Sequence, residues 1–284
     1  MAFLRMIRTT IALGITLTLI APLGASAQAR RAGGAQQYTP AAGARDLRSV
    51  LHNWGWHLGM LRSSEERDLV ASLEYQGKGT MQVDGQPCTL TKYRVSTSYQ
   101  TPGQRVQYTC TRVNGQTHSG IEVVSGPYAW NEDIVGAEIV AGKGKATPMP
   151  GASAERLIRL WAGPQGAPKA AAAGGDKTSV AWDTGKPVVT YPIPGVPGAI
   201  AKATLSDKYQ AERVEITYNG LVTEFTYGKY DDWNNPLNKV EAFYAGTLVE
   251  KRNGVTVRDL TTTETETGNV YVVVPVPASV RSAK

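Results

Sequence analysis

The apolar residues of this chain follow a helical spacing first and an alternating one later. Between residues 47 and 61 they recur every three or four positions, which draws one apolar stripe along a helix. The stripe consists of Leu47, Val50, Leu51, Trp54, Leu58 and Leu61. Gly55 and Gly59 weaken this helix by roughly 1 kcal/mol each. We therefore predict a helix whose stripe packs against another element.

From about residue 69 the pattern is typical of strands, because runs rich in Val, Thr and Tyr are separated by turn dipeptides. Four dipeptides suit two-residue type I′ hairpins, whose central residues need positive φ. They are Asp84-Gly85, Asn114-Gly115, Asn219-Gly220 and Asn253-Gly254. Repeated hairpins predict an antiparallel meander rather than a parallel sheet.

The turn at Asn219-Gly220 predicts a register in which one face of the hairpin is apolar and the other mostly polar. The predicted pairs on the apolar face are Tyr218 with Leu221, Ile216 with Thr223, and Val214 with Phe225. On the polar face Glu215 lies opposite Glu224, which is unfavourable unless that face is solvated. We therefore expect the polar face to meet water.

A second helical segment is predicted from Ser153, acting as N-cap, to about Trp161. The alanines that follow could extend it to about Ala173, but Gly163-Pro164 favours a break. The order of elements is therefore helix, strands, helix, strands.

The strands resume near Thr178 and continue to about Val274, and the tail with Pro275 and Pro277 is expected to fray. The Gly- and Ala-rich stretch at 163–175 is the one composition break that could act as a linker. We predict one continuous domain over residues 44–280.

The first residues have the organisation of a cleavable signal peptide. Arg5 and Arg8 supply the positive end, residues 9–21 are apolar, and Ala25-Ser26-Ala27 is a small-x-small cleavage site. We expect cleavage near Ala27, residues 1–27 as the signal peptide, residues 28–43 as a disordered lead-in, and a mature protein that is periplasmic or secreted. Elsewhere no stretch reaches the roughly 20 apolar residues of a membrane-spanning helix.

The charge of the chain argues against nucleic acid as a partner. Losing Arg5 and Arg8 with the signal peptide lowers the formal net charge from +6 to +4, and the remaining positive charges are scattered. Such a surface is compatible with peripheral contact to anionic lipid headgroups.

Cys88 and Cys110 are the two cysteines, and an even pair in an exported chain favours a disulfide. A tight turn at Pro102-Gly103 would place Val95 opposite Cys110, about 20 Å along the strand from Cys88. Either that loop is wider, or the segment around Pro87 folds back. The proximity that a disulfide needs favours the disulfide over the tight turn.

No catalytic or metal site is expected. His52, His57 and His118 lack a nucleophile and a supporting carboxylate in any recognisable spacing. The acidic residues Asp231, Asp232, Glu264 and Glu266 leave open an alternative in which the protein is a hydrolase of envelope polymers. An oxygen-rich turn at 231–235 lacks the ligand spacing of an EF-hand, and no cofactor is implied.

Large apolar side chains gather at the predicted helices and strand ends. Packing in a filled core and lining of an apolar cavity both need such residues. The candidates for a cavity lining are Trp54, Trp56, Leu58, Tyr128, Trp130, Trp161, Phe225 and Trp233.

Three stretches resemble the LolA/LolB-like periplasmic lipoprotein-carrier superfamily. They are the early helix leading into SLEYQGKGTMQVDG, the segment YQTPGQRVQYTCTRVNGQTHSGIEVVSGPYAWNED, and the hairpin region from RVEITYNGLVTEFTYGKYDDWNNP to LVEKRNGVTVRDLTTTETETGN. The likeness is a pattern of elements over roughly residues 45–280. This chain is longer than a typical carrier and has no lipidation cysteine at its cleavage site.

The resemblance implies an α+β, mostly β fold: a curved antiparallel sheet, an unclosed barrel, with about two helices covering one face. It also implies an exported, non-enzymatic carrier or sensor of a lipid, an acyl chain or a lipidated protein. The alternatives are the envelope polymer hydrolase and a partner-binding structural module without a ligand cavity.

Overall fold

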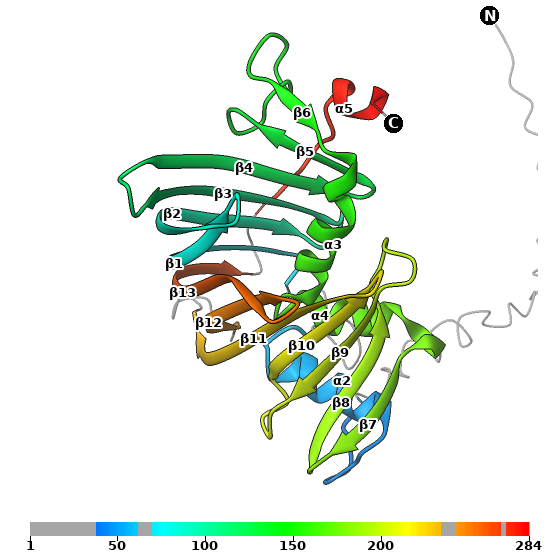
Figure 1. The fold of residues 1–284 in the computed structure, drawn as a ribbon. Coiled ribbons are helices and arrows are strands. Elements are labelled where there is room, and N and C mark those ends of the chain that lie inside the picture. Colours follow the sequence, from blue (N-terminus) through cyan, green and yellow to red (C-terminus); the bar gives the residue numbers. More distant parts are fainter. Residues whose placement is uncertain (1–37, 62–69, 234–241, 268–270, 284) are drawn as a thin grey trace, which may run out of the picture. The chain divides into compact units, whose positions relative to one another are not determined.

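The computed structural model describes residues 38–61, 70–233, 242–267 and 271–283. Its described part contains thirteen strands in one sheet (Figure 1). The strands are β1 (Ser72–Val83), β2 (Gln86–Ser98), β3 (Gly103–Arg112), β4 (Thr117–Ser125), β5 (Tyr128–Glu132), β6 (Ala146–Pro148), β7 (Ser179–Asp183), β8 (Lys186–Pro192), β9 (Ile200–Leu205), β10 (Ala211–Tyr218), β11 (Leu221–Asp232), β12 (Phe243–Arg252) and β13 (Val255–Thr267). The signal peptide and most of the predicted lead-in lie outside the described residues.

Every neighbouring pair of strands is antiparallel, and the sheet order is β6-β5-β4-β3-β2-β1-β13-β12-β11-β10-β9-β8-β7. Two meanders therefore meet where β1 pairs with β13, the last described strand. The sheet is not closed into a barrel, because β6 and β7 lie at its two edges. The predicted mostly β class, the antiparallel meander and the open sheet are confirmed.

Three of the four predicted type I′ turns have positive φ at both central residues, at Asp84-Gly85, Asn219-Gly220 and Asn253-Gly254. The prediction at Asn114-Gly115 is wrong, since only Gly115 has positive φ (82°). There the Oδ1 atom of Asn114 accepts a hydrogen bond from the backbone N–H of Gln116. This side-chain turn competes with the two-residue hairpin.

The predicted register of the β10–β11 hairpin is confirmed over all three apolar pairs. Glu215 does lie opposite Glu224. Arg213 relieves their repulsion, since its Nη2 atom lies 2.5 Å from a carboxylate oxygen of each glutamate. All three side chains are partly exposed, as expected of a solvated face.

Helices lie along one face of the sheet (Figure 1). They are α2 (Leu47–Trp56), α3 (Ser153–Ala162) and α4 (Gly166–Ala173), with 3-10 turns at Pro150–Ala152 and Gly175–Lys177. A short α5 (Ala278–Ser282) near the C-terminus packs separately against β5 and β6. None of the helices in the described part of the chain has the length and hydropathy needed to span a bilayer.

The ends of these helices follow local chemistry. Asp46 caps α2 by accepting the backbone N–H of Ser49, and the helix ends before Gly59, whose φ is +69°. The predicted extension to Leu61 is therefore wrong, because a left-handed glycine stops the helix. Ser153 is not an N-cap, since α3 continues directly from a 3-10 turn without a side-chain cap. The predicted break at Gly163-Pro164 is confirmed.

The main core lies between α2, α3 and α4 and the second half of the sheet. Two smaller hydrophobic clusters lie in the first half of the sheet, and one of them surrounds the disulfide. The C-terminal tail does not fray as predicted: Val274 and Val280 are buried in the cluster that contains Trp130. The apolar area that these two residues remove from water opposes the fraying.

The predicted disulfide is present, with the Cα atoms of Cys88 and Cys110 5.5 Å apart. The loop between β2 and β3 is the wider of the two alternatives, because Ser98 pairs with Gly103. A register shift near Leu90 then brings Cys110 opposite that residue, diagonal to Cys88. The disulfide and the wide loop are thus both consistent with the same pairing register of β2 and β3.

Candidate functional site

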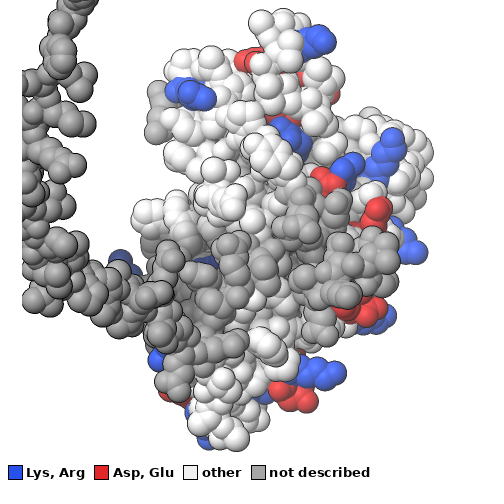
Figure 2. All heavy atoms as spheres, turned by 180° about the vertical axis from the view of Figure 1, so that it is seen from behind, with Lys and Arg blue, Asp and Glu red and all other residues white. Residues whose placement is uncertain are grey.

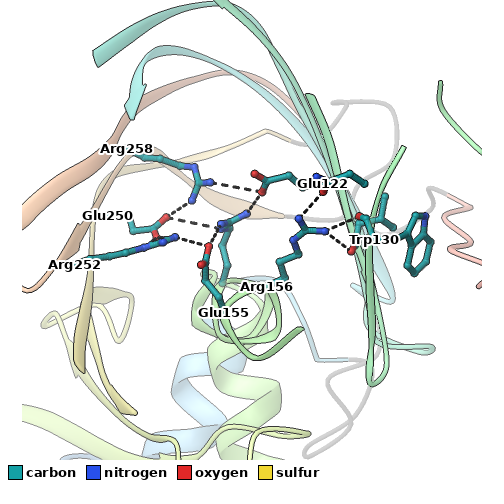
Figure 3. A network of polar contacts seen from close by, with 10 residues as sticks. Glu122, Trp130, Glu155, Arg156, Glu250, Arg252 and Arg258 are labelled. Carbon is teal, nitrogen blue, oxygen red and sulfur yellow. Dashed lines mark hydrogen bonds and ion pairs between the residues drawn. The ribbon is translucent and has the colours of Figure 1, made fainter. Parts of the chain in front are cut away.

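A network of arginine and glutamate side chains fills the middle of the helix-covered face of the sheet (Figure 3). Helix α3 buries Leu157, Leu160 and Trp161 in the main core, and it also directs Arg156 and Arg159 toward charged and polar groups of the sheet. Both arginine side chains are almost wholly removed from water. Charged groups buried to this extent need partners.

Glu250 of β12 is the most deeply buried acid of the network, at 1% exposure. Arg258 of β13 forms a close hydrogen bond with it, the Nη2 atom of Arg252 lies 2.9 Å away, and the Nε atom of Arg159 lies 3.9 Å away. Burial alone would raise the pKa of Glu250, but these three guanidinium groups outweigh it and hold the pKa at about 2.

Glu122 of β4 is a second acid of the network that is surrounded by arginines, and it lies on the other half of the sheet. Its carboxylate lies 2.8 Å from Nη1 of Arg159 and 3.9 Å from Nη2 of Arg258. Burial would raise its pKa, but the two arginines hold the pKa at about 2. Because Arg159 and Arg258 contact both Glu122 and Glu250, the network links the two meanders through α3.

Arg156 has no carboxylate among its hydrogen-bond partners. Its Nη1 atom donates to the backbone oxygens of Val123 (2.9 Å) and Trp130 (2.6 Å), and its Nη2 atom donates to Oδ1 of Asn131 (2.6 Å). Burial lowers the pKa of Arg156 from its ordinary value. Oxygen dipoles therefore hold its charge through direct hydrogen bonds, and Glu122 acts on it through space.

The network carries one positive charge in excess. Its cations are Arg156, Arg159, Arg252 and Arg258, and its anions are Glu122, Glu155 and Glu250. The excess belongs to Arg156, whose guanidinium group is already hydrogen-bonded to backbone and amide oxygens.

An open groove of about 510 Å³ borders this network on the same face. It is lined by Met81, Gln82, Val83, Asp84, Gly85, Tyr108, Glu122, Glu155, Arg252, Val255, Val257 and Arg258. Its volume lies in the range of about 300–1,000 Å³ that is usual for ligand pockets. Apolar side chains from β1 and β13 thus lie beside the charged groups of the network, and polar atoms make up the larger share of the lining.

A smaller and more apolar chamber of about 180 Å³ lies on the other side of Arg252. Ala154, Ile158, Leu221 and Phe225 contribute to its lining. Arg252 and Glu155, whose Nη2 and Oε1 atoms are 2.7 Å apart, line both the groove and the chamber. This ion pair is partly exposed and lies between the two spaces.

Directly between the helices and the sheet, the described residues enclose a void of only about 20 Å³. Five of the residues around this void are tyrosines, and burial raises the pKa of Tyr75, Tyr99 and Tyr244. A void of this size holds about one water molecule. An acyl chain therefore has no room there without a movement of α3.

A second groove, of about 720 Å³, lies over β1 to β4. Gln76, Arg94 and Gln107 of its lining alternate along their strands with residues of the helix-covered face, so they belong to the opposite face. Lys78 and Lys92 are exposed there, and the other side chains are mainly hydroxyls and amides. Polar and apolar atoms contribute about equally to the surface of this groove.

The structure does not bring the eight residues of the predicted cavity lining into one cavity. Phe225 lines both the chamber and the small void. Trp54, Leu58 and Trp161 are packed in the main core, and Trp233 packs against that core from outside.

The three remaining residues of that set lie elsewhere. Trp130 is fully buried with Tyr128 beside its cluster, and its Nε1 atom donates to Oε1 of Glu132 at 3.0 Å. Trp56 is 56% exposed and stacks on His52.

The histidines and acidic residues that the sequence suggested as possible catalytic groups are also dispersed. His57 stacks on Tyr209, and burial and Lys208 lower its pKa. Asp232 accepts the backbone N–H of Ala242.

Glu264 accepts a hydrogen bond from Gln76. Neither Asp231 nor Asp232 nor Glu264 lines any of the four spaces described above, and the Glu266 side chain lies outside the described residues. No group of three His, Cys, Asp or Glu residues in the described part of the chain is arranged to hold a metal ion.

Sequence reasoning missed the charged network, and one reason is visible at the β12–β13 turn. A strict two-residue turn at Asn253-Gly254 would place Val257 opposite Glu250. A register shift after Glu250 places Arg258 there instead. Bulges of this kind re-aim a side chain without a clear sequence signal.

No family model matches the chain, and no curated protein matches it in sequence. Among solved structures, it is similar to a domain described provisionally as an outer membrane lipoprotein-sorting protein from Vibrio parahaemolyticus, with 11% identity and a TM-score of 0.40. The match covers 71% of this chain and 87% of that domain. A likeness at this identity and TM-score does not show the function of this chain.

Proposed function

We propose that this protein is an exported, non-enzymatic carrier or sensor that holds an acyl chain or similar lipid in the groove on the helix-covered face. The observation that carries the proposal is the groove of about 510 Å³, in which Met81, Val83 and Val257 lie beside exposed charge. An amphipathic molecule has the same two parts. Its chain would lie on the apolar residues, and an anionic headgroup would meet the partly exposed guanidinium group of Arg252.

The chamber behind Arg252 extends this site. When the partly exposed Arg252–Glu155 ion pair opens, the groove and the chamber become continuous, and the chain reaches Ile158 and Phe225. Each buried CH₂ group contributes about 0.8 kcal/mol, so a few methylenes in the chamber give useful affinity without polar specificity. Arg252, released from Glu155 but still hydrogen-bonded to Glu250, then meets the headgroup.

The first experiment looks for the ligand. The purified protein is extracted with organic solvent for mass spectrometry, and the delipidated protein is titrated with a fluorescent fatty acid. We expect co-purifying lipid and saturable binding of the probe. Absence of both would contradict the proposal and favour a binding module with a filled core.

The second experiment tests the position of the site. Ala154 lines the chamber, whereas Ala172 is an exposed residue of α4. Ala154→Trp should weaken binding of the fluorescent fatty acid at least about tenfold by filling the chamber, equivalent to about 1.4 kcal/mol. Ala172→Trp is the matched control and should leave binding unchanged. Equal affinity of the two variants would exclude the chamber as part of the site.

A further inference from the structure

The guanidinium group of Arg252 is only partly used by the charged network. Its Nε and Nη2 atoms both donate to Oε1 of Glu250, at 3.0 and 2.9 Å. Its Nη2 atom also donates to Oε1 of Glu155 at 2.7 Å. Among the described residues, none accepts a hydrogen bond from its Nη1 atom. The N–H groups of Nη1 are therefore available to a ligand.

These contacts leave one edge of the guanidinium group open to an anion. Glu250 lies at the edge formed by Nε and Nη2, so the second edge is formed by Nη1 and Nη2. A carboxylate or phosphate group binds such an edge through two parallel N–H···O hydrogen bonds. Glu155 contacts only the Nη2 end of this edge, and Figure 3 shows its carboxylate beside Arg252. Glu155 thus occupies part of the position that a ligand carboxylate would take.

Exposure decides which of the two acids can yield to a ligand. The side chain of Glu250 is 2% exposed, and separating it from Arg252 would leave a buried charge with one partner fewer. The side chain of Glu155 is 48% exposed, and an ion pair in such a position is weak and exchangeable. Glu155 also keeps a partner when it leaves Arg252, because the same Oε1 atom lies 2.8 Å from Nη2 of Arg159.

The face seen in Figure 2 offers no other source of selectivity for a charged headgroup. Acidic and basic side chains lie next to one another on that face rather than in patches of one sign. Such a mixture produces no broad field that would attract an anion. Recognition of a headgroup therefore depends on local hydrogen bonds, and Arg252 and Glu155 are the two charged residues that line both the groove and the chamber.

We propose that the ligand carries a carboxylate or phosphate group that binds the Nη1–Nη2 edge of Arg252, and that Glu155 is a built-in competitor for this edge. The inference rests on the proposed function, since it concerns the same groove and chamber. An anionic lipid gains two charge-assisted hydrogen bonds, less the cost of displacing Glu155, whereas a neutral lipid of the same chain length gains neither. Glu155 is thus a specificity-determining residue.

Competition between chain-matched lipids tests the headgroup. The delipidated protein is loaded with N-phenyl-1-naphthylamine, a neutral fluorescent apolar probe, which is then displaced by dodecanoate, dodecyl phosphate or methyl dodecanoate. We expect dodecanoate to bind about tenfold more tightly than its methyl ester. The phosphate arm shows which of the two anions the edge prefers. Equal affinity for dodecanoate, dodecyl phosphate and the ester would overturn the inference but leave the proposed function standing, whereas a probe that never binds saturably would contradict the proposed function.

Variants of the ion pair test the competition. Glu155→Gln should strengthen binding of dodecanoate about twofold to fivefold and leave binding of the ester unchanged. Arg252→Lys should lose most of the preference for dodecanoate, because an ammonium group has no fork of donors. Glu212→Gln is the matched control, since Glu212 is 43% exposed and pairs with Lys186 away from the groove and the chamber. It should change neither affinity.

Thermal denaturation of each variant confirms that the binding measurements compare folded proteins. Weaker or unchanged binding of dodecanoate by Glu155→Gln would overturn the role of Glu155 as a competitor. An equal gain for dodecanoate and the ester would also overturn it, because Glu155 would then act as a steric plug. A full preference for dodecanoate in Arg252→Lys would overturn the assignment of the headgroup to the fork of Arg252.

Discussion

Replacing Glu250 with Gln removes the central negative charge of the network while preserving the shape of the side chain. Glu250 is almost fully buried and contacts Arg252, Arg258 and Arg159. The variant leaves three guanidinium groups around a neutral amide. Because the desolvation of the arginines is then uncompensated, we expect a large loss of stability.

The magnitude follows from the pKa of this carboxyl group. Its ordinary value is 4.5, and the folded protein holds it at about 2. A difference of this size corresponds to roughly 3 kcal/mol of stabilisation of the charged form. Removing one partner from a buried ion pair costs about 3–5 kcal/mol, which agrees. For a domain of this size a loss of 3 kcal/mol lowers the melting temperature by about 6–12 °C.

The pH dependence provides a second check. A carboxyl group with a depressed folded pKa stabilises the protein above its unfolded pKa, and this contribution is lost as pH falls toward the folded pKa. For Glu250 the window runs from about 4.5 down to about 2, and about 2 kcal/mol should already be lost at about pH 3. The parent protein and Glu250→Gln should therefore converge in stability on acidification.

Urea denaturation at neutral pH and at several acidic pH values measures both effects. Glu155→Gln is the matched control, because Glu155 also contacts Arg159 and Arg252 but its side chain is 48% exposed. Its loss should stay below about 1 kcal/mol. If Glu250→Gln unfolds at the same urea concentration as the control at neutral pH, the buried charge of Glu250 does not stabilise the fold.

Three further predictions concern other parts of the chain. Replacing both Cys88 and Cys110 with Ser should lower the free energy of unfolding by about 3 kcal/mol, because the disulfide closes a loop with a sequence separation of 22; an unchanged urea midpoint would refute this. Trp130→Phe removes a donor to the buried carboxylate of Glu132 and should cost about 1.5–3 kcal/mol by thermal denaturation, whereas a smaller loss would mean that this bond is not important. The intact mass of protein recovered from the cell envelope should lack residues 1–27, and a mass that includes them would contradict the predicted export.

The meander was predictable because each hairpin depends on its own local sequence. At Asn219-Gly220 two residues tolerant of positive φ are flanked by alternating apolar residues, so turn and register follow together. The disulfide was predictable from residue count and compartment, and it in turn favoured the wider β2–β3 loop over the tight turn.

Local sequence patterns gave wrong predictions where tertiary contacts or competing turn chemistry determined the local structure. The tail after Val274 carries prolines and resembles a fraying end, yet Val280 packs beside Trp130. Nothing near the tail in sequence indicates that partner. The sequence likewise could not show whether the aromatic residues line a cavity, because a filled core and an apolar cavity contain the same types of side chain.

The sequence by itself thus determined the antiparallel strands, the positions of most turns, the two helical regions and the disulfide, all of which depend on neighbours along the chain. The tertiary structure alone decided that β1 pairs with β13, that a bulge turns Arg258 toward Glu250, and that α3 carries Arg159 between Glu122 and Glu250. These contacts join residues far apart in sequence, and their partners are selected by the packing of whole elements. The groove beside the network is a product of that packing.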